Sequence, residues 1–221
     1  MMKGQYHAGR PCSAPRPAPR LRLLVCITVL AVALTVAWPQ QTHAHEGIHP
    51  PSVPENLEVP AGHKVFLEGR AEGTQNYICL PLSSGLSWTF FGPQATLFND
   101  KARQTTTHFL SANPEPKDSD MLRPAWQHSR DTSTVWARQV MGATSVDPAF
   151  VAKGAIPWLL LEVVGAKAGP TGGQRLTRAK FIHRVNTSGG MAPSIPCTAV
   201  GERAFVPYTA DYFFYKAATR E

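Results

Sequence analysis

The sequence predicts an all-β fold, mainly an antiparallel β-sandwich or barrel-like, with long loops and at most short helices. Nine short runs of strand composition follow one another, each bounded by Gly, Pro, Asn or Asp. No segment carries a sustained apolar stripe of helical period, and the best candidate, residues 147–153, spans barely two turns. Because parallel strands need long crossover connections, we expect antiparallel strands, and a sandwich before a barrel.

The expected strands are short and evenly spread along the chain. They lie at residues 64–71, 74–80, 87–91, 105–111, 125–129, 132–141, 158–165, 176–186 and 208–216. Residues 112–123 form the longest irregular stretch, so a long loop is expected there. The Gly-rich segment 164–173 lacks the Gly-Lys-Ser/Thr of a phosphate loop and contains Pro170, so it is interpreted as a hairpin loop.

The residue patterns of two of the expected strands predict how each strand is buried. In residues 176–186, Phe181, His183 and Val185 alternate with Ile182 and Arg184, which predicts a half-buried strand. Residues 158–164 are apolar on both faces up to Glu162. The second pattern is typical of a strand that is covered on two sides.

Residues 1–44 are interpreted as an export signal. Residues 23–37 are uncharged and mostly apolar, and five Lys or Arg residues precede them without any acidic residue. The run is shorter than the roughly 20 residues of a spanning helix, which favours a secretory signal over an uncleaved anchor. Thr42 and Ala44 offer cleavage before His45, with Ala37 as an earlier alternative. We therefore expect a secreted, periplasmic or cell-envelope protein that meets the membrane only during export.

The mature chain is expected to hold one folded domain behind a short arm. Residues 45–56 contain three prolines and no apolar period, so they are interpreted as an extended Pro-rich arm. Residues 57–217 are interpreted as a single β domain.

The net charge excludes nucleic acid as an expected partner. The chain carries +7, but residues 1–44 hold five of the 22 Lys and Arg residues and none of the 15 acids, so the other 177 residues carry only +2. A nucleic-acid binder needs a basic stripe to neutralise phosphates. The remaining basic cluster is interpreted as a solvated strand face; it consists of Lys167, Arg175, Arg178, Lys180 and Arg184.

Cleavage would leave two of the four cysteines, Cys79 and Cys197. In an oxidising compartment such a pair usually forms a disulfide, with two separate buried thiols as the alternative. No Cys-x-x-Cys is present to suggest a zinc or redox site.

Candidate binding residues combine aromatic rings with nearby polar groups. Residues 212–215 alternate aromatic side chains between two strand faces, so one pair must face outward or against another layer. His128 and Asp131 form a polar cluster, although an Asp that caps its own turn is the commoner arrangement. The candidates are Trp126, His128, Asp131, Asp211 and Tyr212.

A copper site is the sharper alternative. If cleavage exposes His45 as the first residue, its amine and imidazole plus a second histidine make a T-shaped copper brace similar to that of lytic polysaccharide monooxygenases. We take His108 as the candidate for the second histidine; the others available are His49, His63, His128 and His183. If this copper site is not formed, no cofactor is expected. No nucleophile elbow or other catalytic signature is present.

Several ordered motifs together resemble a known family. They include Gly73-Thr74-Gln75-Asn76-Tyr77-x-Cys79, Ile156-Pro157-Trp158-Leu159-Leu160-Leu161 and Val206-Pro207-Tyr208-Thr209-Ala210-Asp211-Tyr212. The combination resembles the secreted family catalogued as domain of unknown function 3455. The resemblance implies export, paired cysteines and no established activity. Thr132 stands where the family pattern has Gly, and His183 where Gln is usual.

These observations favour an exported binding or surface module for a glycan or a small ligand. The alternatives are a copper-dependent redox protein that uses His45, and a structural component of an envelope or wall. An enzyme is the less favoured class.

Overall fold

We describe the fold from a computed structural model, which covers residues 47–119 and 121–218. The expected export segment and His45 lie outside the described residues. Within the described part of the chain, no helix is long and apolar enough to cross a bilayer.

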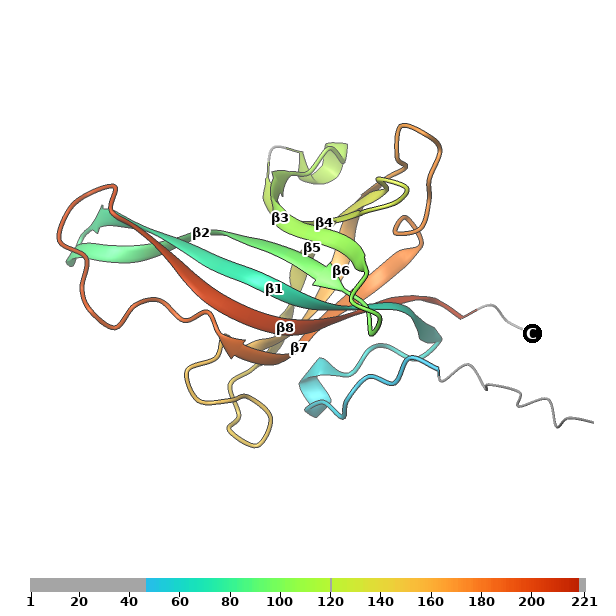
Figure 1. Ribbon diagram of the computed structural model, residues 1–221, viewed down its shortest axis with the longest axis horizontal. Helices are drawn as coiled ribbons and strands as arrows, with labels where there is room; N and C mark the ends of the chain where they lie inside the picture. The colour runs from blue at the N-terminus through green and yellow to red at the C-terminus, as the bar shows by residue number, and fades with distance from the viewer. Residues whose placement is uncertain (1–46, 120, 219–221) are drawn as a thin grey trace, which may run out of the picture. The chain divides into compact units, whose positions relative to one another are not determined.

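Eight antiparallel strands close into a barrel (Figure 1). Each strand pairs with the next one along the chain, and β8 returns to pair with β1. The strands are β1 His63–Leu82, β2 Gly85–Phe98, β3 Gln104–Ala112, β4 Leu122–His128, β5 Thr134–Ser145, β6 Trp158–Lys167, β7 Ala179–Gly189 and β8 Arg203–Ala217. The all-β, antiparallel prediction is confirmed, and of the two expected architectures the barrel is the one present.

Helical structure is limited to two single turns in the described residues, η1 Glu55–Leu57 and η2 Pro116–Asp118. Residues 147–153 form turns rather than a helix. Residues 164–173 run from the end of β6 into the loop that leads to β7, so the hairpin interpretation is confirmed.

Two expected strands, 64–71 and 74–80, are one continuous strand, β1. Gly73 lies between the two expected strands. A Cβ at this position would lie 2.1 Å from the Gln94 carbonyl oxygen and 2.5 Å from the Ala95 Cα, so only glycine fits. A glycine inside a strand allows this close backbone approach without ending the strand. The glycine therefore signals a tight strand contact and not a turn.

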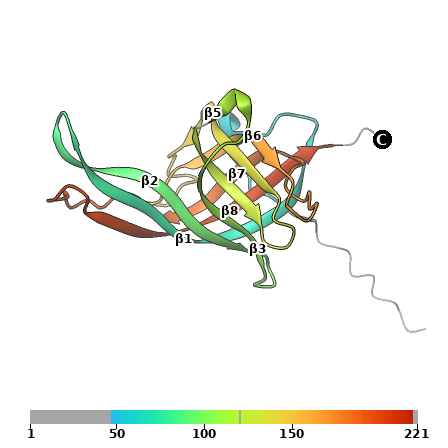
Figure 2. The same ribbon diagram turned by 90° about the horizontal axis from the view of Figure 1, so that it is seen from above.

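A three-stranded ribbon projects from the barrel (Figure 2). β1 stays paired with β2 as far as Leu82 and with β8 as far as Ile78. β2 pairs with β3 only from Ala95 onward, and β8 pairs with β7 only from Tyr208 onward. The outer parts of β1, β2 and β8 therefore leave the barrel wall together.

The apolar side chains form two clusters, one on each side of the barrel wall. The inner cluster fills the barrel and includes Trp126, Leu161, Ile182 and Phe214. The outer cluster includes Leu57, Trp158, Leu160, Phe213 and Tyr215. β6 contributes to both clusters, which confirms the prediction of a strand covered on two sides.

The N-terminal segment supplies the outer layer. Leu57 is fully buried, and Ile48 and Val53 pack against the outer cluster. Nε2 of the buried His183 lies 2.7 Å from the Leu57 carbonyl oxygen, and its Nδ1 lies 3.0 Å from the Tyr215 hydroxyl. Because a carbonyl only accepts, Nε2 donates to it and Nδ1 accepts from Tyr215. Burial lowers the pKa of His183, which keeps this neutral arrangement at pH 7.

Candidate functional site

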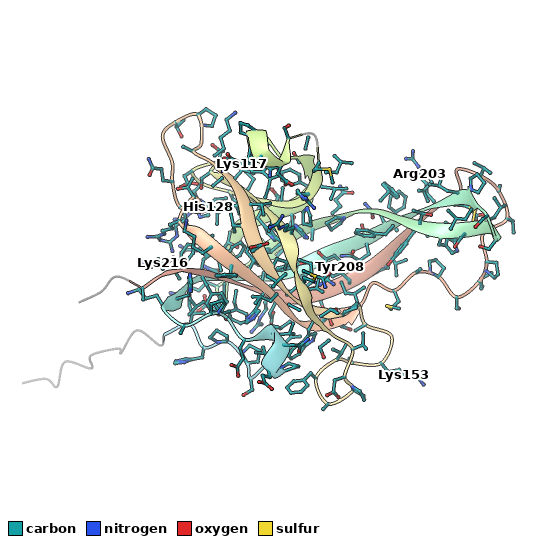
Figure 3. The ribbon with its side chains drawn as sticks, turned by 180° about the vertical axis from the view of Figure 1, so that it is seen from behind. Lys117, His128, Lys153, Arg203, Tyr208 and Lys216 are labelled. Atoms are coloured by element: carbon teal, nitrogen blue, oxygen red, sulfur yellow. A yellow bond between two sulfur atoms is a disulfide. The ribbon has the colours of Figure 1, made fainter. Side chains whose placement is uncertain are left out.

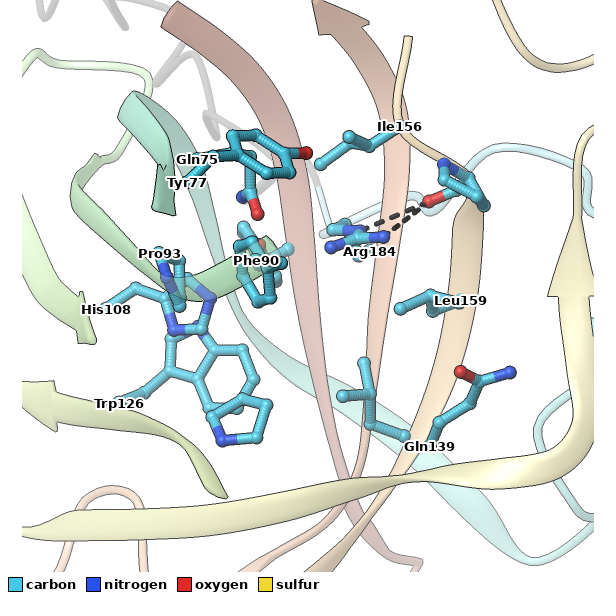
Figure 4. Close-up of a pocket in the computed structure, with 14 residues that line it drawn as sticks. Gln75, Tyr77, Phe90, Pro93, His108, Trp126, Gln139, Ile156, Leu159 and Arg184 are labelled. Atoms are coloured by element: carbon cyan, nitrogen blue, oxygen red, sulfur yellow. Dashed lines mark hydrogen bonds between the residues drawn. The ribbon is translucent and has the colours of Figure 1, made fainter. Parts of the chain in front are cut away.

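The barrel encloses a cavity of about 320 Å³ (Figure 4). This is the liquid volume of roughly ten water molecules. Residues from at least six of the eight strands and from the loop before β6 line it: Gln75, Tyr77, Phe90, Pro93, His108, Pro124, Trp126, Gln139, Ile156, Pro157, Leu159, Leu161, Arg184 and Tyr212. Phe90 and Gln139 are also exposed, so the cavity reaches the surface beside them.

One wall of the cavity is a stack of aromatic rings. The rings of His108 on β3 and Trp126 on β4 lie parallel, with centroids 4.2 Å apart and an angle of 8° between planes. The Tyr212 ring on β8 packs at an angle against both, at 5.2 and 5.5 Å. All three side chains are almost wholly buried. The wall is fixed by packing on several sides.

His108 is neutral in this wall. Its Nδ1 lies 2.9 Å from the Ala125 carbonyl oxygen and must carry the proton, because that oxygen only accepts. Burial lowers the pKa of His108 from its ordinary 6.5 to about 3, against the opposing effect of the bond to Ala125. Nε2 is therefore an unprotonated acceptor, with no hydrogen-bond partner among residues 47–119 and 121–218.

Arg184 on β7, the cross-strand neighbour of Tyr212, faces the same cavity opposite His108 and Trp126 (Figure 4). Its Nε and Nη2 donate to the Pro157 carbonyl oxygen at 3.2 and 2.9 Å. The interpretation of Arg184 as part of a solvated strand face is wrong. The alternation of side chains along β7 does define two faces. The N-terminal arm covers the face that carries Phe181 and His183, so the face that carries Ile182 and Arg184 points into the barrel.

The other polar groups at the cavity are uncharged. The Tyr212 hydroxyl lies 3.4 Å from that of Tyr208, which is buried behind the lining residues, and burial raises the pKa of both. Gln75 Nε2 and Trp126 Nε1 are buried without a hydrogen-bond partner in the described chain. No Asp or Glu lines the cavity.

The structure separates the five candidate binding residues. Trp126 and Tyr212 line the cavity, as does His108. His128 lies at one end of the barrel, away from Tyr208 in its interior (Figure 3), and Asp131 follows it in the turn between β4 and β5.

Asp131 ties that turn to the loop before β7. Its Oδ1 accepts from the amide and hydroxyl of Ser133, at 3.0 and 2.7 Å, and its Oδ2 accepts from the Arg175 amide at 2.7 Å. Burial alone would raise the pKa of the Asp131 carboxyl, but these hydrogen bonds lower it to about 2. Asp131 therefore caps its own turn, which is the commoner of the two arrangements that the sequence suggests.

We expect Asp131→Asn to lower the free energy of unfolding by about 2 to 3 kcal/mol at pH 7, because an amide cannot replace a carboxylate as acceptor for all these donors. The folded-state pKa is depressed, so this contribution is complete above about pH 4 and is lost as the pH falls toward 2. Urea unfolding of the native protein and the variant between pH 7 and pH 2 measures this difference in the free energy of unfolding. The exposed Asp100→Asn is the control, and a deficit that does not shrink in acid would contradict this role.

Thr132, in the same turn, has a left-handed backbone with φ of 55°. This conformation is costly for a β-branched residue and free of strain for glycine. We expect Thr132→Gly to raise the free energy of unfolding by about 0.5 to 1 kcal/mol, after the added chain entropy of glycine is deducted. Thr144→Gly in β5 is the matched control and should destabilise the protein. Equal losses in both variants would exclude strain at Thr132.

Asp211 lies on the outer face of β8. Its Oδ2 accepts from Asn186 Nδ2 at 2.8 Å, and its Oδ1 lies 3.9 Å from Arg70 Nε. A separate hollow of about 220 Å³ lies here, with His49 and Glu68 among its lining residues. Asp211 is therefore not part of the barrel cavity.

Cys79 and Cys197 form the expected disulfide, which is confirmed. It joins the ribbon to the loop between β7 and β8. The Trp88 Nε1 also donates to the Ile195 carbonyl at 2.9 Å, and the Tyr77 hydroxyl donates to the Gly190 carbonyl at 2.7 Å.

The copper brace stays a prediction, because His45 lies outside the described residues. Within residues 47–119 and 121–218, no three His, Cys, Asp or Glu side chains gather where they could hold a metal ion.

The family model described as protein of unknown function (DUF3455) matches residues 60–216. The chain belongs to this family. Neither curated proteins nor solved structures give a match. The DUF3455 match takes in the barrel strands almost completely, so the cavity lies within the region that defines the family.

Proposed function

We propose that this DUF3455 protein binds a small organic molecule inside its barrel. The observation that carries the proposal is the cavity of about 320 Å³, lined mainly by aromatic and aliphatic side chains with a few polar groups. Ligand sites in proteins have this size and composition, and the mouths of β-barrels are common places for them. The proposal concerns a binding protein and includes no catalytic step.

The placement of the tryptophans favours a small ligand over a glycan. A glycan-binding platform needs exposed aromatic faces. Trp126, Trp136 and Trp158 are at most 6% exposed, and Trp88 is half-buried with its Nε1 bonded to a backbone carbonyl. Trp126 and Tyr212 present their rings to the cavity instead.

The rigidity of the site also supports binding. The aromatic wall is held by ring packing and by the bond from His108 to the β4 backbone. Arg184 is held by two hydrogen bonds to Pro157. A site that is ordered before the ligand arrives loses little conformational entropy on binding.

The test is a screen of small aromatic and alicyclic compounds by saturation-transfer NMR, with a variant that blocks the cavity. Gln139 is exposed and lines the cavity, so Gln139→Trp fills the entrance with little effect on the core. Met141→Trp, at a side chain 97% exposed on the same strand, is the matched control. We expect compounds that bind the native protein and Met141→Trp but not Gln139→Trp.

Two results would overturn the proposal. One is binding that survives equally in Gln139→Trp. The other is a screen without any binder, which would favour a structural role in an envelope or wall.

A further inference from the structure

Arg184 places a positive charge at the cavity that no acidic group balances. None of the cavity residues is acidic, and in the described chain no carboxylate lies within 4.0 Å of the Arg184 guanidinium. Two of its five N–H groups donate to Pro157, and the guanidinium also hydrogen-bonds the neighbouring Tyr212 hydroxyl, which leaves up to two for a ligand. An arginine held in place without a counter-ion is a ready site for an anionic group, because a guanidinium pairs with a carboxylate through two parallel hydrogen bonds.

The charge of Arg184 acts both on Tyr212, its cross-strand neighbour on β8, and on His108 at the other side of the cavity. Burial raises the pKa of Tyr212, and the Arg184 charge opposes this by favouring the phenolate. The same charge adds to the effect of burial in lowering the pKa of His108. A positive potential therefore extends over the space between β7 and the aromatic wall, which a ligand with a negative end would neutralise.

The rest of the cavity suits the body of such a ligand. The His108 and Trp126 rings, each covering one face of the other, line one side of the cavity, and Phe90, Leu159 and Leu161 add apolar surface. A planar ring packs well against such surface in an edge-to-face or offset arrangement. A carboxylate balances the single positive charge of Arg184, whereas a phosphate monoester, with nearly two negative charges, would leave an excess of negative charge in the cavity.

Resting on the proposed function, we infer that the ligand is a small aromatic carboxylate. Its carboxylate pairs with Arg184, and its ring packs against the His108 and Trp126 wall.

Three probes with the same ring system test this inference by isothermal titration calorimetry: 2-naphthoate, the neutral 2-naphthamide and the cationic 2-naphthylmethylamine. We expect the native protein to bind the carboxylate at least ten times more tightly than the amide, and the amine least. Arg184→Gln should bring the carboxylate and the amide within threefold of each other, chiefly through weaker carboxylate binding. Arg184→Lys, which keeps the charge, should retain part of the preference.

Arg138→Gln is the matched control, because Arg138 pairs with Glu162 at 2.6 Å and does not line the cavity. It should leave the order of affinities unchanged. Equal affinity for carboxylate and amide in the native protein, or a preference that survives in Arg184→Gln, would overturn the inference. Amide binding that Gln139→Trp abolishes would still support the proposed function. If none of the three probes binds, the inference fails, and the wider screen decides the proposed function separately.

Discussion

Replacing Cys79 and Cys197 together by serine is expected to lower the free energy of unfolding by about 4 to 5 kcal/mol. The disulfide closes a loop of 118 residues, and the entropy that such a cross-link removes from the unfolded chain grows with loop length. Few other contacts hold the loop of residues 190–202 to the ribbon. The chief ones are backbone bonds between Cys79 and residues 201 and 202, the Trp88 bond to Ile195 and the Tyr77 bond to Gly190.

Urea unfolding at pH 7, with and without a phosphine reductant, measures this loss. Reduction of the native protein should reproduce the stability of the double serine variant, and the variant itself should not respond to the reductant. A loss below about 1 kcal/mol would contradict the estimate from loop closure. It would mean that the unfolded chain keeps this loop closed without the disulfide.

Acid is expected to remove a similar amount of stability through His108. The unfolded chain takes up a proton near pH 6.5, whereas the buried His108 does so only near pH 3. Because the folded-state pKa is depressed, stability is complete above pH 6.5 and falls as the pH is lowered toward 3. A difference of about 3.5 pKa units corresponds to a loss on the order of 4 to 5 kcal/mol over that range.

The variant His108→Asn isolates this effect. An asparagine Nδ2 can donate to the Ala125 carbonyl in place of the histidine Nδ1, but asparagine does not titrate. The variant should be less stable than the native protein at pH 7 because it leaves a space beside Trp126, and that deficit should shrink between pH 6.5 and pH 3. NMR titration of His108 with a midpoint above pH 6 would contradict the burial of this residue.

The sequence allowed the strands and the disulfide to be predicted because both leave local signals. Glycine, proline and alternating apolar residues mark strands, and the two cysteines that the expected cleavage would leave can pair in only one way. Closure into a barrel has no such signal, because it depends on pairing between β1 and β8, which lie at opposite ends of the domain. The choice between sandwich and barrel was for this reason open.

The cavity was only partly predictable. Trp126 and Tyr212 were expected from their aromatic character, but the sequence could not show that His108 stacks on one and packs against the other. Arg184 was missed because an alternating strand does not reveal which face points inward. No local signal could have identified it, because Arg184 shares its face with the apolar Ile182 while the opposite face carries the equally apolar Phe181 and Val185.

His128, Asp131 and Asp211 illustrate the opposite error, in which predicted site residues lie outside the cavity. Polar residues that lie close together in sequence suggested a site, but hydrogen bonds within the turn account for His128 and Asp131. Asp211 alternates with Tyr212 along β8 and so lies on the other side of the barrel wall.

A crystal structure of the protein with 2-naphthoate tests the central claim, ligand binding within the barrel, most directly. We predict density for one molecule in the cavity, with its carboxylate oxygens within hydrogen-bonding distance of Arg184 and its ring against the His108 and Trp126 wall. An unoccupied cavity, with the compound bound only to exposed side chains of the ribbon such as Phe205, would contradict the account.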